Sequence, residues 1–110
     1  MYKELDVYDF VKEFRDSRFK DRFTEQGLIV LFNYIEKLEE ENKENYSLDL
    51  LTLVDQFREF ENIESVLEEF DLKSKEELKE TYNILEIPNT ERLIVQVDNF
   101  PKPWQIVKCF

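Results

Sequence analysis

The 110-residue chain contains no histidine, one glycine and one cysteine. Without histidine it lacks the side chain that most often serves as a general base near neutral pH and as a metal ligand. A single glycine excludes the glycine-rich phosphate-binding loops of nucleotide-binding proteins, and a single cysteine, Cys109, excludes an internal disulfide. We therefore expect a protein that is not an enzyme, binds neither metal nor cofactor, and works in a reducing compartment.

Long apolar runs are absent too. No stretch approaches the roughly 18 apolar residues that a membrane-spanning helix needs. Residues 1–6 have neither the basic start nor the apolar stretch of a secretory signal peptide. We therefore expect a soluble cytoplasmic protein that makes no contact with membranes.

Apolar and aromatic residues, by contrast, are plentiful. They make up 42% and 15% of the chain, which is enough to bury one core without a metal or a disulfide. Because no segment reads as a linker, we expect a single domain over residues 1–110. It divides into an N-terminal helix with a connection (1–23), an acidic α+β core (24–99) and a tail with prolines and a tryptophan (100–110).

Apolar residues three and four positions apart predict the helices. A short helix is expected over residues 7–16, and a long one over 24–42, where Thr24 is a good N-cap. The apolar stripe of the long helix consists of Leu28, Leu31, Phe32, Ile35 and Leu38. Asn62 is expected to cap a further helix, and residues 74–77 (SKEE) have the spacing of a capping box at the start of another.

The segment 48–58 fits two structures. One set of its residues has helical spacing: Leu50, Val54 and Phe57. Another set alternates as in a strand: Leu48, Leu50, Thr52 and Val54. Periodicity alone cannot decide between the two for such a short apolar run. We favour the strand.

Two further strands are predicted over residues 84–87 and 92–97, because Pro88 and Asn89 between them favour a turn. These strands are expected to form an antiparallel hairpin, and residues 105–110 are expected to add an edge strand. The predicted fold class is α+β, with a small three-stranded antiparallel sheet packed against one long helix and two or three short helices.

Negative charge is concentrated in one part of the chain. The sequence has 26 acidic and 15 basic residues, a formal charge of −11. Residues 1–23 hold six acids and six bases, residues 100–110 hold two bases and no acid, and residues 24–99 hold 20 acids and seven bases. This charge opposes direct binding to nucleic acid or anionic lipid and attracts basic surfaces.

Many of these acids recur three or four residues apart, so that a helix would place them on one face. Like charges at that spacing cost about 0.2–0.5 kcal/mol per pair, so local stability does not explain them. We expect an acidic surface that docks on a basic protein, with charge spacing that imitates nucleic acid. Its candidate residues are Glu36, Glu40, Glu44, Asp55, Glu59, Glu61, Glu64, Glu68 and Asp71. The alternative is a solvated face that only maintains solubility.

Trp104 has a structural and a functional interpretation, and Gly27 has a structural one. Trp104 either covers the sheet or serves as an aromatic anchor for a partner, since tryptophan is enriched at interface hot spots. With Phe110 it would also suit self-association into a homodimer. Gly27, near the start of the long helix, is expected to permit close packing against a neighbouring residue.

Three stretches resemble a family of small acidic proteins from bacteriophages and mobile elements. Residues 23–28 (FTEQGL) and 31–40 (LFNYIEKLEE) are similar to its F-S-Y-E-G-L and L-F-x-Y-L-E-x-L-E-E patterns. Residues 48–53 (LDLLTL) resemble its L-D-V-I-A-L segment, and residues 93–100 resemble its closing I-I-Q-N-F. The paired cysteines of the family fall on Val54 and Asp55 here, so no function of those thiols can be transferred.

The resemblance implies an α+β fold in which segment 48–58 is a strand, and a viral or mobile-element origin. The family has no assigned catalytic residues. Small acidic phage proteins often inhibit host defence, as anti-restriction or anti-CRISPR factors. We therefore expect an inhibitor in the host cytoplasm that binds a basic, nucleic-acid-binding defence protein. The alternative is a structural or adaptor protein that self-associates.

Overall fold

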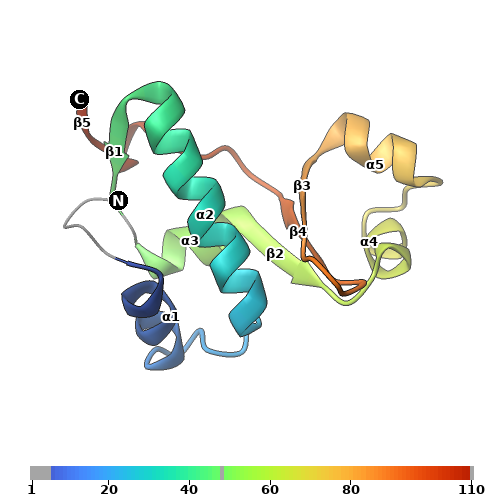
Figure 1. The fold of residues 1–110 in the computed structure, drawn as a ribbon. Coiled ribbons are helices and arrows are strands. Elements are labelled where there is room, and N and C mark those ends of the chain that lie inside the picture. The colour runs from blue at the N-terminus through green and yellow to red at the C-terminus, as the bar shows by residue number, and fades with distance from the viewer. Residues whose placement is uncertain (1–5, 48, 110) are drawn as a thin grey trace.

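The computed structural model describes residues 6–47 and 49–109, and in this part of the chain helices and strands are interspersed (Figure 1). The helices are α1 (Val7–Arg15), α2 (Glu25–Asn42), α3 (Leu50–Gln56), α4 (Ile63–Glu69), α5 (Lys75–Thr81) and the 3₁₀ helix η1 (Pro103–Gln105). The strands are β1 (Glu44–Tyr46), β2 (Phe57–Phe60), β3 (Asn83–Glu86), β4 (Leu93–Gln96) and β5 (Ile106–Cys109). The predicted α+β class is confirmed.

A three-stranded antiparallel sheet has β4 at its centre, in the order β2-β4-β3. The register places Phe57 beside Gln96 on one side of β4 and Leu85 beside Ile94 on the other. The predicted hairpin of β3 and β4 is therefore confirmed. Its turn contains Asn89 at a φ of 62°, a left-handed conformation that asparagine tolerates better than most residues.

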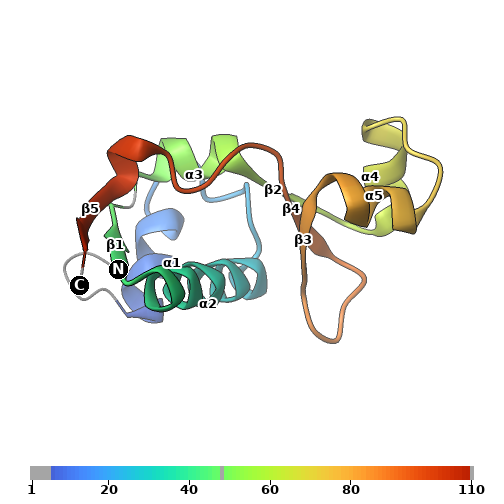
Figure 2. The same ribbon diagram turned by 90° about the horizontal axis from the view of Figure 1, so that it is seen from above.

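The sheet lies between α2 on one side and the pair α4 and α5 on the other, and its central strand β4 is buried on both faces (Figure 2). Successive residues of a strand point to opposite faces. Ile94 accordingly joins the core under α1, α2 and α3, whereas Leu93 and Val95 join the core under α4 and α5. This explains why the central strand is a continuous apolar run instead of an alternating one.

The predicted helix starts are confirmed by their caps. The Thr24 side chain accepts a hydrogen bond from the backbone N–H of Gly27 at 3.0 Å. The Asn62 side chain accepts one from Ser65 N–H at 2.9 Å, and the Ser74 hydroxyl accepts one from Glu77 N–H at 3.2 Å. Each cap involves residues three apart in sequence, so the local pattern is sufficient to predict it.

The strand predicted over residues 48–58 is wrong for residues 50–56, which form α3, and correct only where β2 begins at Phe57. Asp49 caps α3, because its carboxylate accepts hydrogen bonds from Leu51 N–H at 3.2 Å and from the Thr52 hydroxyl at 2.9 Å. Leu53 and Val54 then face the core together. Leu48, the expected first residue of the strand, lies outside the described residues.

The strand expected after Gln105 forms as β5, but it pairs with β1 in a separate two-stranded sheet. Gln105 positions this segment: its buried side-chain amide exchanges hydrogen bonds with that of Gln56 at 2.8 and 3.3 Å. The Gln105 carbonyl also accepts a hydrogen bond from Ser47 N–H at 2.7 Å. The C-terminal segment is thereby tied to α3 and to the chain after β1.

The molecule is elongated, with extents of 40 × 28 × 23 Å. The C-terminal end of α2 and the β1–β5 sheet lie at one end, and α4 and α5 lie at the other (Figures 1 and 2). Residues 61–92, which contain α4, α5, β3 and the hairpin turn, are referred to below as the α4–α5 lobe. None of the helices in the described part of the chain is long and apolar enough to cross a membrane.

Candidate partner-binding surface

The acids predicted to form one surface fall into separate groups. Three belong to the C-terminal half of α2 and the start of β1, one lies near the end of α3, and four lie on or beside α4: these are Glu36, Glu40 and Glu44, then Asp55, then Glu61, Glu64, Glu68 and Asp71. Because α4 and the C-terminal end of α2 lie at opposite ends of the molecule (Figure 1), the first and last groups are not neighbours.

The group beside α4 forms a row along the solvent side of that helix. Val66 is fully buried against the sheet, while Glu64 and Glu68, one helical turn apart, are exposed. Glu61 lies just before the helix and Asp71 just after it, and both are exposed as well. Among the residues that the structure describes, none of the four carboxylates forms an ion pair. We refer to these four residues as the α4 row.

The surroundings of the α4 row are also acidic. Residues 61–92 contain ten acids and four bases. Of the bases near the row, Arg92 binds Glu59 and Lys75 binds Glu86 at 3.5 Å, while Arg58 on β2 binds Glu69 at 3.5 Å. These three bases are therefore paired with acids outside the row.

Glu59 is the one predicted surface acid that the structure buries. Its side chain is 1% exposed. The carboxylate accepts hydrogen bonds from the backbone N–H and the hydroxyl of Thr24, at 3.0 and 3.2 Å, and pairs with Arg92 Nε at 2.6 Å. Glu59 thus anchors the start of α2 to the sheet and does not belong to an exposed surface. The alternation along β2 is the signal that could have revealed this, since Phe57 and Glu59 share the face toward α2.

Gly27 lies against this buried carboxylate. A Cβ atom added at Gly27 would overlap the Glu59 carboxylate, so only glycine fits here while Glu59 keeps its position. The predicted role of Gly27 in close packing is confirmed, and its neighbour is Glu59.

Trp104 lies in η1 with 69% of its surface exposed, so it does not cover the sheet. The neighbouring Ile106 and Val107 are also exposed, at 37% and 42%. Gln105 between them is buried and fixed by the Gln56 amide, which holds η1 so that Trp104 faces solvent. Trp104 is therefore accessible to a partner, at a distance from the α4 row along the molecule. Phe110 lies outside the described residues.

Among the described residues, three side chains have a pKa shifted from its usual value. Burial raises the pKa of the Tyr34 and Tyr46 hydroxyls above the usual 10.0. A hydrogen bond from the Lys102 ammonium lowers the pKa of Asp98 below its usual 3.8. In residues 6–47 and 49–109, no group of three or more Asp, Glu and Cys side chains is arranged to hold a metal ion.

Comparison with models of protein families, with curated protein sequences and with solved structures found no match to this chain. The resemblance of about residues 7–100 to the phage family therefore stays a prediction from those motifs. The α4 row is the candidate site, because its carboxylates are exposed and form no ion pair among the described residues.

Proposed function

We propose that the protein is a non-catalytic inhibitor that docks the α4 row on a basic surface of a nucleic-acid-binding protein. The observation that carries the proposal is the row itself: four exposed carboxylates on or beside α4, none of which forms an ion pair with another residue that the structure describes. The row places one like-charged neighbour pair inside α4, Glu64 and Glu68, at a cost to that helix of about 0.2–0.5 kcal/mol. Its retention at one end of an elongated molecule is understandable if the charge acts on another macromolecule.

The inhibition would be steric. A protein that binds DNA or RNA presents lysines and arginines along a channel, spaced to meet phosphates about 1.7 Å apart along the duplex axis. The narrow α4–α5 lobe can enter such a channel end-on, with the α4 row against the basic wall and the α2 end outside. Long-range attraction would make association fast at low salt and slower as salt screens the charges.

The resemblance to the phage family supports a host defence protein as the partner, and the net charge of −11 supports a basic one. On this proposal the protein acts in the cytoplasm of an infected bacterial cell. It prevents a restriction or CRISPR component from reaching nucleic acid, and it does so without binding nucleic acid itself.

A capture experiment tests the proposal. The immobilised protein is exposed to bacterial lysate treated with nuclease and then washed at stepwise higher salt. We expect basic nucleic-acid-binding proteins to be retained at low salt and released over a narrow range as salt rises. Retention of nothing but further copies of this chain, unaffected by salt, would contradict the proposal.

A second candidate function is self-association as a structural or adaptor protein. The exposed Trp104, Ile106 and Val107 favour it, because they are close in sequence and give this segment exposed apolar surface. A dimer held by this surface would persist at high salt. The oligomeric state of Trp104→Ala, compared with the unaltered protein by sedimentation at high salt, tests it: the alternative requires the unaltered protein to be a dimer and the variant a monomer.

A further inference from the structure

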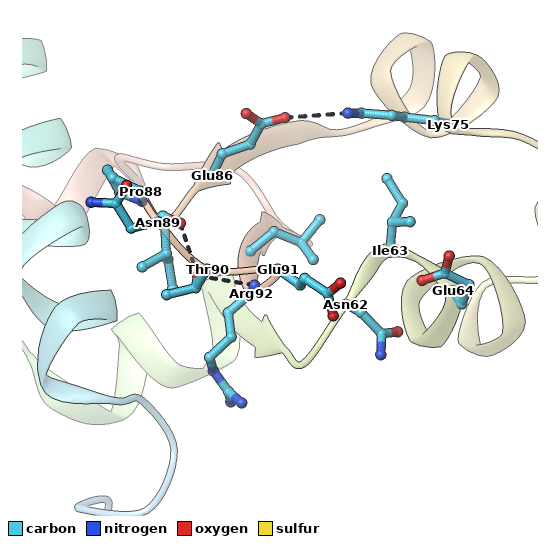
Figure 3. A pocket seen from close by; sticks show the side chains of 12 residues that line it. Asn62, Ile63, Glu64, Lys75, Glu86, Pro88, Asn89, Thr90, Glu91 and Arg92 are labelled. Atoms are coloured by element: carbon cyan, nitrogen blue, oxygen red, sulfur yellow. Dashed lines mark hydrogen bonds and ion pairs between the residues drawn. The ribbon is translucent and has the colours of Figure 1, made fainter.

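An open groove of about 640 Å³ lies between the β3–β4 hairpin and the beginnings of α4 and α5 (Figure 3). Ile63 and Leu93 line it on the inside, and both belong to the core beneath α4 and α5. Pro88 in the hairpin turn adds further apolar surface. The groove therefore has an apolar base that a hydrocarbon chain could cover.

Carboxylates surround this apolar base. Glu86 lies on one side of Ile63 together with Lys75, and Glu64 and Glu91 lie on the other side (Figure 3). Three acids therefore line the groove, and they come from three separate segments: the end of β3, the start of α4 and the hairpin turn.

The two bases that line the groove do not neutralise it. Arg92 points away from the groove (Figure 3), because its Nε is held by the buried Glu59 at 2.6 Å. Lys75 pairs with Glu86 at 3.5 Å, and both side chains are about half exposed or more, at 49% and 67%. Exposed pairs of this kind contribute little and exchange readily. Glu64 and Glu91 are left without a basic partner among the described residues.

We propose that this groove receives an arginine side chain of the partner. The arginine stem would lie on Ile63, Leu93 and Pro88, and its guanidinium would bridge the carboxylates of Glu64 and Glu91. Arginine suits the site because its stem is apolar and its planar head can bind two carboxylates at once. It is also one of the residues that most often dominates binding at interfaces.

This inference deepens the proposed function and rests on it for the identity of the partner. The link between the two is Glu64, which belongs both to the α4 row and to the groove. A basic partner bound along the row would therefore lie next to the groove. A side chain of that partner near the start of α4 could enter it. The row would attract the partner, and the groove would fix its register.

A titration followed by NMR tests the groove alone, with the capped tripeptide Gly-Arg-Gly as the probe. We expect saturable shifts of the methyl signals of Ile63 and Leu93. The same tripeptide with citrulline in place of arginine has the same shape without the charge, and we expect it to bind about tenfold more weakly or not at all. Shifts that spread over all acidic surfaces without saturating, or equal binding of the two peptides, would overturn the inference.

Two variants of equal charge sharpen the test. Glu64→Gln with Glu91→Gln should weaken binding of the arginine tripeptide about tenfold, whereas Glu76→Gln with Glu80→Gln, on α5 and outside the groove lining, should leave it unchanged. Equal effects of the two double variants would contradict arginine binding in the groove.

The two proposals can fail separately. If the groove does not bind the arginine tripeptide while lysate proteins still bind the α4 row, only this inference falls. If the peptide binds the groove while the row captures nothing, the proposed function falls instead.

Discussion

Glu59 joins three parts of the molecule at the scale of single residues. From β2 its carboxylate binds Thr24, the N-cap of α2, and Arg92, which precedes β4. It also lies against Gly27, where a Cβ atom would be. A buried carboxylate is costly unless it is paired and hydrogen-bonded, and here it has both an arginine and two donors from Thr24. The long helix is thereby fixed on the sheet at one point.

Gly27→Ala should destabilise the protein by about 1–3 kcal/mol. In an ordinary helix this change stabilises by about 0.5–1 kcal/mol. Here the new methyl group forces the Glu59 carboxylate away, with loss of its bonds to Thr24 and Arg92. Chemical denaturation measures the effect, and Asn33→Ala, at an exposed position of α2, is the control that should not destabilise.

A double-mutant comparison identifies the cause. With Glu59→Ala already present, the space beside Gly27 is open, and Gly27→Ala should then cost little or even stabilise. An equal loss of stability in both backgrounds would show that the glycine is needed for another reason.

Tyr46 should make the protein sensitive to alkaline pH. Burial raises its pKa in the folded state above the 10.0 of the unfolded chain. Below pH 10 the hydroxyl is neutral in both states, and its contribution to stability is complete. As the pH rises from 10 toward the folded pKa, the unfolded chain ionises first, and stability is lost.

The measurement is the difference in unfolding free energy between the protein and its Tyr46→Phe variant, at several pH values from neutral to about 11. Phenylalanine does not ionise, so the unaltered protein should lose stability relative to the variant above pH 10. Tyr34 should behave in the same direction. A difference that stays constant across this pH range would rule out the expected titration.

At the scale of elements, the sequence predicts what depends on neighbours and misses what depends on distant residues. The caps at Thr24, Asn62 and Ser74 were predictable because donor and acceptor are three residues apart. The segment 48–58 was not, because both periodicities are present in it. Its first part is a helix capped by Asp49, and it forms a strand from Phe57 on, where it pairs with β4.

The pairing of β1 with β5 shows the same limit. Their residues are some sixty positions apart in the register, from Glu44 beside Cys109 to Tyr46 beside Ile106. The short run Glu44–Tyr46 has no alternation long enough to indicate a strand by itself. The residue just before β5, Gln105, is held by Gln56 of α3 and by the N–H of Ser47 after β1, and such distant partners cannot be read from a sequence pattern.

Gln105→Leu should therefore loosen the β1–β5 sheet. The change removes the acceptor for the Lys102 N–H and for the Gln56 amide, and unpaired buried groups of this kind cost about 1–3 kcal/mol. Hydrogen exchange should rise in peptides that cover β1 and β5, with much less change in β4. Trp104→Ala, next to it but exposed, is the matched control, expected within about 0.5 kcal/mol of the unaltered protein. Equal loosening by both changes would contradict this role of Gln105.

At the scale of the whole molecule, the sequence predicted how much negative charge there is and in which segment, but not where it lies in space. The distance between the α4 row and the acids of α2 follows from the central sheet, which separates the two sets of helices. The burial of Glu59 could not be predicted from the sequence either. It depends on Arg92 and Thr24, which are more than thirty residues away in each direction.

On the proposed function, the position of the negative charge, and not its amount, creates the binding surface. Two variants with the same net charge separate these possibilities. In the first, the α4 row is neutralised by Glu61→Gln, Glu64→Gln, Glu68→Gln and Asp71→Asn. In the second, four exposed acids outside the α4–α5 lobe are neutralised by Glu13→Gln, Asp16→Asn, Asp21→Asn and Glu41→Gln.

The decisive measurement is the amount of basic protein that each variant captures from bacterial lysate at low salt, once circular dichroism has shown that both are folded. We expect the second variant to capture nearly as much basic protein as the unaltered protein does. The first should capture at least about tenfold less, since each charged contact is worth about 1.5–3 kcal/mol. Equal capture by the two variants would contradict this expectation.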